Sequence, residues 1–465
     1  MRAAEPIRFD GMPTMKLLVT MLLVGCCGCA RGPEFDLVIT GGTVYDGAGT
    51  PQGIRRIDVG INGDHISALG DLSGRSARLA IDASNRVVAP GFIDAYGRSG
   101  TTLLVDGNGE SHTRQGITTE ILADAGPAFW TAATTPPADQ ALLARFNVKL
   151  GTNEPLSYVE QLSARGTSVN VARLVPGSFV STSVMADTTR SLTAGELAKM
   201  QDVLETAMRA GAIGLSIDWD APGARAFTTD ELIALARIVA RNGGLYVSTL
   251  RGNTPVETSI REVITIAATA GGGLPFMIAN LNVLPPAQKG TLAAAIAAIR
   301  EADVRGISAS ASVTSYSDDE ADVRPALTYP RAVIGTGTAA ARTEGELSQI
   351  SMQPAAYGAF PRLLGEYVRN AKLLELREAI YRVTGLPAAQ FRIPQRGFIR
   401  EDYFADLVIF DPQTIASPAT NAQPHQYPTG IDYVIVNGVQ VVTPAGHTGA
   451  HPGRILPGAA LRPAS

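Results

Sequence analysis

The amino-acid sequence predicts an α/β protein: a (β/α)8 barrel of the TIM type, with a small β-sandwich domain assembled from both ends of the chain. Short strand patterns with Asn-Gly turns occupy both ends, and strand and helix patterns alternate between them over a stretch long enough for eight βα units. The 465 residues, 45% of them hydrophobic, suffice to bury a large core. We expect a signal segment at 1–26, a linker at 27–34, a composite β domain at 35–88 and 405–456, a barrel at 89–404 and a tail at 457–465.

The two ends of the chain carry the strands expected for the composite β domain. Apolar and β-branched residues form short runs there, and Asn62-Gly63 and Asn437-Gly438 are hairpin turn signals. The expected strands are 35–39, 57–61, 65–69, 405–410, 433–436 and 439–442.

Two capping boxes mark helix starts in the middle of the chain: Thr193 with Glu196, and Thr228 with Glu231. Apolar residues follow each box at helical spacing. The expected strands here are 212–217, 245–249, 275–281 and 307–313, and the helices include 255–270 and 286–301. Repeated βα units predict a parallel sheet. A doubly wound open sheet is the alternative, but no Gly-x-Gly-x-x-Gly motif follows a strand.

Composition restricts both the partners and the ligands. The chain has 39 Lys and Arg against 43 Asp and Glu and no basic run, so no nucleic-acid partner is expected. Its three cysteines all lie at positions 26, 27 and 29, which leaves the folded part without a thiolate. The five histidines are His65, His112, His425, His447 and His451.

The amino-terminal residues resemble a bacterial lipoprotein signal. Met15-Lys16 precedes an apolar run at 17–24 that is too short to span a bilayer, which needs about 20 residues. The run ends in Leu23-Val24-Gly25-Cys26, which resembles a lipobox and predicts lipidation at Cys26. We therefore expect a lipid-anchored protein of the cell envelope, on the outer membrane if the host has one. A plain secretory signal is the alternative, and translation starts at Met1 or Met15.

Sequence blocks spread over residues 35–456 resemble the D-aminoacylase (N-acyl-D-amino-acid deacylase) branch of the amidohydrolase superfamily. They include Val-Ala-Pro-Gly-Phe-Ile-Asp at 88–94, Gln-Gly-Ile-Thr-Thr-Glu at 115–120, Tyr-Gly-Ala-Phe-Pro-Arg at 357–362 and Pro-His-Gln-Tyr-Pro at 424–428. The resemblance implies a barrel with its site at the C-terminal mouth of the strands. It also implies a zinc-held hydroxide and an aspartate that transfers the proton to the leaving amine.

At the positions where the family carries its chemistry, this chain carries other residues. The two histidines of the family's His-x-His motif correspond to Tyr96 and Arg98, its bridging cysteine to Ala125, its third and fourth histidines to Thr249 and Asn280, and its catalytic aspartate to Gly337. We therefore expect no catalytic residue of the family type, no metal site and no zinc cofactor. The remaining candidates for lining a pocket are Tyr96, Arg98, Asp124, Arg251, Asn280 and Tyr316.

Arg98 introduces a fixed positive charge at this site. Two unit charges about 4 Å apart interact by about 4 kcal/mol at an effective dielectric constant near 20, and a divalent ion would feel about twice that as repulsion. We expect Arg98 to pair with Asp124 or Asp94; the alternative is that it points to solvent. Asp218 and Asp220 follow a predicted strand, where they are expected to cap the loop.

Three functions follow from these replacements. The first is a pseudoenzyme that binds a small-molecule ligand or a partner. The second is an active hydrolase of C–N bonds, such as those of acylated D-amino acids, that uses Asp94, Asp124, Asp218 and Asn280 as unconventional metal ligands. The third is a metal-free enzyme of another class, in which Tyr96, Arg98 and Arg251 stabilise charge.

Overall fold

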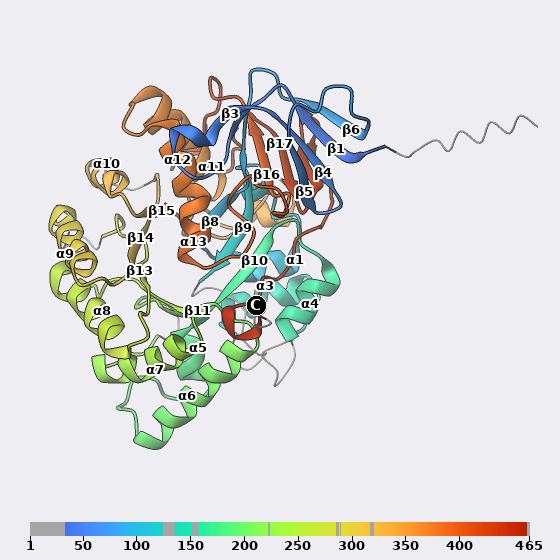
Figure 1. The fold of residues 1–465 in the computed structure, drawn as a ribbon. Helices are drawn as coiled ribbons and strands as arrows, with labels where there is room; N and C mark the ends of the chain where they lie inside the picture. The colour runs from blue at the N-terminus through green and yellow to red at the C-terminus, as the bar shows by residue number, and fades with distance from the viewer. Residues whose placement is uncertain are drawn as a thin grey trace, which may run out of the picture.

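The structure of the chain is a computed structural model that describes residues 33–123, 135–150, 157–221, 224–284, 288, 290–316 and 320–462 (Figure 1). The signal segment with Cys26, most of the linker, Asp124 and Ala125 lie outside the described residues. Within the described part, no helix is both long and apolar enough to cross a membrane.

Eight parallel strands form a nearly closed barrel, which confirms the predicted fold class. In order along the sheet they are β8 (Phe92–Gly97), β9 (Ile117–Leu122), β10 (Asn170–Pro176), β11 (Gly214–Ile217), β12 (Leu245–Ser248), β13 (Phe276–Ile278), β14 (Ala309–Val313) and β15 (Ala332–Ile334). The segment after β15 returns to β8 and narrows the remaining gap. There the backbone N–H of Gly337 donates to the carbonyl of Tyr96, and that of Arg98 donates to the carbonyl of Thr338, both at 2.9 Å.

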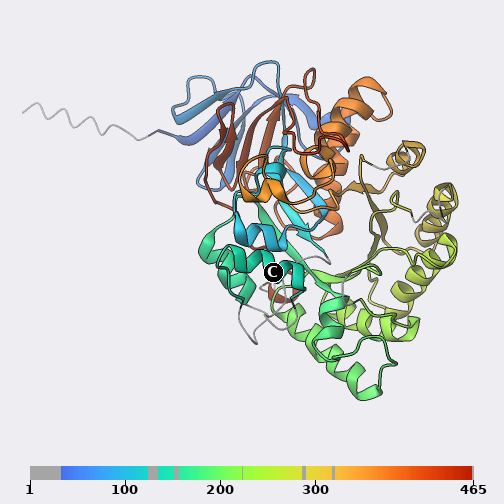
Figure 2. The same ribbon diagram turned by 180° about the vertical axis from the view of Figure 1, so that it is seen from behind.

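Helices cover the outside of the barrel (Figures 1 and 2). The helices of the described residues are α1 (Gly100–Val105), α2 (Glu110–Thr113), α3 (Pro137–Arg145), α4 (Ser157–Arg165), α5 (Gly177–Thr182), α6 (Ala194–Arg209), α7 (Thr229–Arg241), α8 (Val256–Ala270), α9 (Leu292–Val304), α10 (Glu320–Thr328), α11 (Ala355–Arg362), α12 (Leu376–Val383) and α13 (Gly385–Gln390), with a π-helical segment at Leu363–Asn370.

Both predicted capping boxes are present, at the first residues of α6 and α7. The hydroxyls of Thr193 and Thr228 each accept a hydrogen bond from a backbone N–H three residues on, and the carboxylates of Glu196 and Glu231 accept the backbone N–H of the two threonines. The helix expected at 286–301 was placed too early, since α9 begins only at Leu292. Gly290, two residues earlier, has φ +81°, a backbone conformation that a right-handed helix does not contain.

The chain ends form two sheets, which confirms the composite β-sandwich. One has the order β5 (His65–Gly70), β4 (Asp58–Asn62), β1 (Phe35–Thr40), β6 (Ala77–Asp82). The other has the order β19 (Gly446–His447), β18 (Val439–Thr443), β17 (Ile431–Val436), β16 (Leu407–Phe410), β7 (Val87–Pro90), β2 (Thr43–Tyr45), β3 (Ile54–Arg56). Leu37 and Ile61 of the first sheet share a core with Leu407 and Ile435 of the second, so residues from both ends of the chain build one hydrophobic layer.

Side-chain alternation along β8 and β9 determines which residues face the barrel interior. Ile93, Ala95 and Ile121 belong to the interior cluster, together with side chains from other barrel strands. Because successive residues of a strand point to opposite faces, Asp94 and Glu120 lie on the outer face of the sheet.

Candidate functional site

An ion pair joins two strand ends at the mouth of the barrel. Arg98 follows β8 and Asp218 follows β11, and the Nη2 atom of Arg98 donates to Oδ2 of Asp218 at 2.6 Å. The Asp218 side chain is 5% exposed and that of Arg98 33%. Asp218 also accepts the backbone N–H of Asp220 at 3.1 Å, as expected of a loop cap.

The expectation that Arg98 pairs with Asp94 was therefore wrong. Asp94 lies on the outer face of the sheet, and its carboxylate instead accepts hydrogen bonds from the backbone and hydroxyl of Thr336 at 3.0 and 2.6 Å. Asp124 lies outside the described residues. Arg98 does form an ion pair at the mouth, but with Asp218, which the sequence analysis did not name as its partner.

Other sequence-predicted residues gather at the same mouth. The Arg98 guanidinium lies 5.7 Å from the centre of the Tyr96 ring. Gly337 has φ +67°, and a Cβ added there would lie 3.3 Å from Oδ1 of Asn280. The structure thus brings Tyr96, Arg98, Asn280 and Gly337 together. A glycine in this position offers no side chain for proton transfer.

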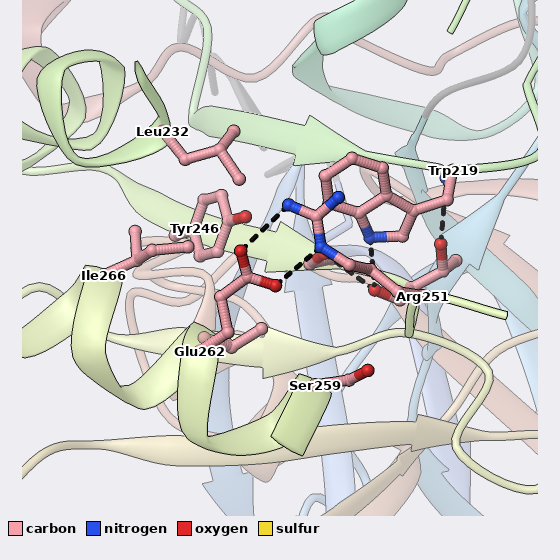
Figure 3. A pocket seen from close by; sticks show the side chains of 10 residues that line it. Trp219, Leu232, Tyr246, Arg251, Ser259, Glu262 and Ile266 are labelled. Carbon is pink, nitrogen blue, oxygen red and sulfur yellow. Dashed lines mark hydrogen bonds and ion pairs between the residues drawn. The ribbon is translucent and has the colours of Figure 1, made fainter. Parts of the chain in front are cut away.

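Arg251, in contrast, is held beside helix α8 (Figure 3). Its guanidinium lies 3.7 Å from the centre of the Trp219 ring and donates two hydrogen bonds to Glu262, at 2.7 and 2.8 Å. Burial raises the pKa of the Glu262 carboxyl, but hydrogen bonds from Arg251 and Thr229 outweigh it and hold this pKa below its ordinary value. The pocket drawn in Figure 3 has no room for a water molecule. The Arg251 guanidinium is therefore enclosed by side chains there, and the Glu262 carboxylate balances its charge.

Thr249 and Tyr316 also make contacts that occupy their polar atoms. Thr249 accepts the backbone N–H of Trp219 on its hydroxyl and the indole N–H on its carbonyl, both at 3.1 Å. Tyr316 donates to the hydroxyl of Ser417 at 2.7 Å, and the Arg362 guanidinium lies 4.6 Å from the centre of its ring. These contacts hold loops in place around the barrel.

A buried cluster that the sequence analysis missed lies behind strands β8 and β9. Asp94 on β8, His112 on α2 and Glu120 on β9 are all fully buried. The Nδ1 atom of His112 lies 3.2 Å from Oε2 of Glu120 and 3.9 Å from Oδ2 of Asp94. A glutamate inside an otherwise apolar and threonine-rich strand was the available signal, because a buried carboxylate requires a partner.

The environment of this cluster changes the proton affinity of its members. Burial raises the pKa of Asp94 to about 6, against the lowering effect of His112 and with a further increase from Glu120. Burial alone would lower the pKa of His112, but the Glu120 carboxylate outweighs it, so the pKa lies above its ordinary value.

The donor set of the cluster fits a divalent metal ion. One ligand atom from each of the three side chains lies within 4.8 Å of the others. One imidazole nitrogen and two carboxylate oxygens are ligands that zinc accepts in proteins. The mouth fits less well, because Tyr96, Arg98, Thr249, Asn280 and Gly337 provide neither imidazole nor thiolate and the guanidinium of Arg98 lies among them.

Comparisons with known proteins extend over most of the chain. A family model described as the amidohydrolase family matches residues 347–442. The D-aminoacylase of Alcaligenes xylosoxydans xylosoxydans is 32% identical, with 91% of this chain and 97% of that protein covered. The N-acyl-D-glutamate deacylase of the same organism is 31% identical, with 91% and 96% covered.

Solved structures agree with these relatives. A D-aminoacylase described with a binuclear metal centre has a TM-score of 0.81 and 30% identity, covering 91% of this chain and all of that one. The N-acyl-D-glutamate deacylase of Bordetella bronchiseptica, in complex with zinc and a phosphonate inhibitor, has a TM-score of 0.80 and 28% identity, covering 91% and 99%.

These findings correct the expectation that the chain has no metal site and no zinc cofactor. A structural relative contains zinc, and this chain itself brings one ligand atom from each of Asp94, His112 and Glu120 within 4.8 Å of the others. Identity above 30% with a full-length relative, together with the shared barrel and β-sandwich, establishes the family. The chain belongs to the D-aminoacylase family of the amidohydrolases.

Proposed function

We propose that this protein uses the barrel mouth of its family for binding a small molecule or a partner, and does not hydrolyse N-acyl-D-amino acids there. The observation that carries the proposal is the ion pair between Arg98 and Asp218, which ties two strand ends across the mouth. Gly337 adds a second argument. General acid–base catalysis needs a titratable side chain within hydrogen-bond reach of the reacting atoms, and this position has none.

The experiment is a turnover assay with a panel of N-acetyl-D-amino acids, including the D-methionine, D-glutamate and D-aspartate derivatives, in the presence of zinc chloride. The expected release of free amino acid equals that of the protein-free reaction. Turnover that rises in proportion to protein concentration and is lost on addition of a chelator would overturn the proposal. Calorimetric titration with the same panel measures binding without turnover.

The second candidate is an active hydrolase of C–N bonds. Its support is the family membership and the Asp94, His112 and Glu120 cluster, which offers a donor set for a metal. Because all three side chains are fully buried, a substrate could reach a metal there only after the wall of the barrel opened. In the assay above, this candidate requires metal-dependent turnover that His112→Asn abolishes.

We also propose that Cys26 is lipidated and anchors the protein to the cell envelope. The support is the signal-like sequence from Met15 to Cys26. Metabolic labelling with radioactive palmitate in a bacterial host should label the wild-type protein and leave Cys26→Ser unlabelled. Equal labelling of both proteins would contradict lipidation at this residue.

A further inference from the structure

The side chains behind strands β8 and β9 suggest a metal site in the wall of the barrel. We propose that Asp94, His112 and Glu120 hold one divalent ion of the zinc class, and that the ion has a structural role at the seam where the barrel closes. This inference does not depend on whether the mouth is catalytic.

The separations between ligand atoms agree with this assignment. Zinc bonds to nitrogen and oxygen are about 2.0–2.2 Å long, so two ligands of one ion lie at most about 4.4 Å apart. The distances from Nδ1 of His112 to Oε2 of Glu120 and to Oδ2 of Asp94 are 3.2 and 3.9 Å. Both lie within that limit, and one ligand atom of each of the three side chains lies within 4.8 Å of the other two.

Backbone groups orient the two carboxylates. The Oδ1 atom of Asp94 accepts the backbone N–H groups of Tyr96 and Thr336, at 3.1 and 3.0 Å, and Oε1 of Glu120 accepts that of Ser99 at 3.0 Å. In each carboxylate one oxygen is thus anchored by the backbone, and the other lies 3.2 Å (Glu120) or 3.9 Å (Asp94) from Nδ1 of His112. The Oδ2 atom of Asp94 also accepts the hydroxyl of Thr336 at 2.6 Å. Such supporting contacts are typical of metal ligands, whose orientation they fix.

Charge balance gives an independent argument. When both buried carboxylates are ionised, even a protonated His112 leaves one negative charge uncompensated among these three residues. Burying an unpaired charge is costly, and a divalent ion with a neutral imidazole balances the two carboxylates. The Nε2 atom of His112 has no hydrogen-bond partner among the described residues, so the polar contacts of this ring lie within the cluster.

The location of the cluster indicates what the ion would do. Its residues come from β8, β9 and α2, and Asp94 also binds Thr336, which follows β15. The ion would therefore connect the first two barrel strands with the segment that meets the last one. Because the three side chains have no exposed surface, we assign it to stability and not to substrate binding.

The test measures bound metal and thermal stability, without any activity assay. The full-length protein is expressed with zinc chloride in the medium and desalted, and its metal content is determined by mass spectrometry. We expect about one equivalent per chain. Removal by a strong chelator should lower the melting temperature, and zinc chloride should restore it.

Three variants locate the site. His112→Asn should lose the metal and the response to the chelator. His451→Asn, a change of the same kind at an exposed histidine bonded to Asn108, should retain both the metal and the response to the chelator. Arg98→Gln at the mouth should also retain both, which separates this site from the position that the family resemblance indicates.

Two results would overturn the proposal. One is wild-type protein with less than a tenth of an equivalent of metal and a melting temperature that neither chelator nor zinc changes. The other is a full equivalent of metal in folded His112→Asn. If His112→Asn does not fold, the response of the wild-type protein to chelator and zinc still decides the question.

Discussion

At the scale of single residues, the mouth of the barrel depends on the pair of Arg98 and Asp218. Arg98→Gln removes the cation and leaves the almost fully buried carboxylate of Asp218 without its partner. We expect the free energy of unfolding to fall by about 1–2 kcal/mol, a value reduced because a third of the Arg98 side chain is exposed to solvent. Urea denaturation at pH 7 measures the change.

A double-mutant cycle provides the control for this prediction. Once Asp218→Asn has removed the negative charge, the ion pair is already broken. Arg98→Gln should then lower the free energy of unfolding by less than it does in the wild-type protein. Equal costs in the two backgrounds would mean that the ion pair contributes no coupling energy.

The pair of Arg251 and Glu262 predicts a dependence of stability on pH. The pKa of Glu262 is lowered in the folded protein, so the ionised carboxylate stabilises the fold at pH values above the pKa of glutamate in the unfolded chain, about 4.3. That contribution is lost as the pH falls through the folded-state pKa. We expect Glu262→Gln to be less stable than the wild-type protein at pH 7 and to approach it at acidic pH. A constant difference from pH 7 to pH 3 would contradict this origin.

At the scale of elements, the two capping boxes are the most directly testable features. Thr228→Ala removes the hydroxyl that accepts the N–H of Glu231, and it should lower the free energy of unfolding by about 1 kcal/mol. Thr206→Ala is the control, because this exposed threonine lies inside α6 and bonds only the carbonyl of Asp202. Thermal denaturation of both variants should show a loss for the cap and almost none for the control.

Local sequence signals predicted the starts of α6 and α7 correctly, because residues within one helical turn determine each of them. Thr193 and Thr228 begin their helices because the groups that satisfy the first N–H donors lie three residues away. The predicted start at residue 286 was wrong: α9 begins at Leu292, after Gly290, whose φ of +81° does not belong to a right-handed helix. The parallel strand order followed from the repetition of βα units, which local patterns also show.

The candidate site was predicted less completely, because it depends on contacts between distant residues. Arg98 was recognised as a cation at the mouth, but its partner comes from a strand 120 residues further on. Glu120 and His112 are only 8 residues apart, yet Asp94 joins them only when β8 and β9 pair. The small number of histidines excluded the family's set of metal ligands, but it did not reveal the cluster of Asp94, His112 and Glu120.

At the scale of the whole molecule, the β-sandwich and the barrel are joined by a buried polar network. Asp406, which precedes β16, accepts hydrogen bonds from the side chain of Asn170 on β10 and from the backbone of Asn437, at 3.0 and 2.8 Å. Arg396 donates to both Asp406 and Asn437. Each of these four side chains is at most 4% exposed, so the network provides a water-free connection between the two parts.

The network predicts that the two parts lose stability together. Asp406→Ala leaves the buried guanidinium of Arg396 without a carboxylate and the Asn170 amide without an acceptor, which we expect to cost about 3–5 kcal/mol. Glu344→Ala, at an exposed carboxylate, is the matched control and should change stability by less than about 0.5 kcal/mol. Differential scanning calorimetry should show the whole transition of Asp406→Ala moving to lower temperature. A buried network that couples two parts makes the stability of each depend on the other. If one transition moved and a second stayed at its wild-type temperature, the barrel and the β-sandwich would therefore be independent units, contrary to this prediction.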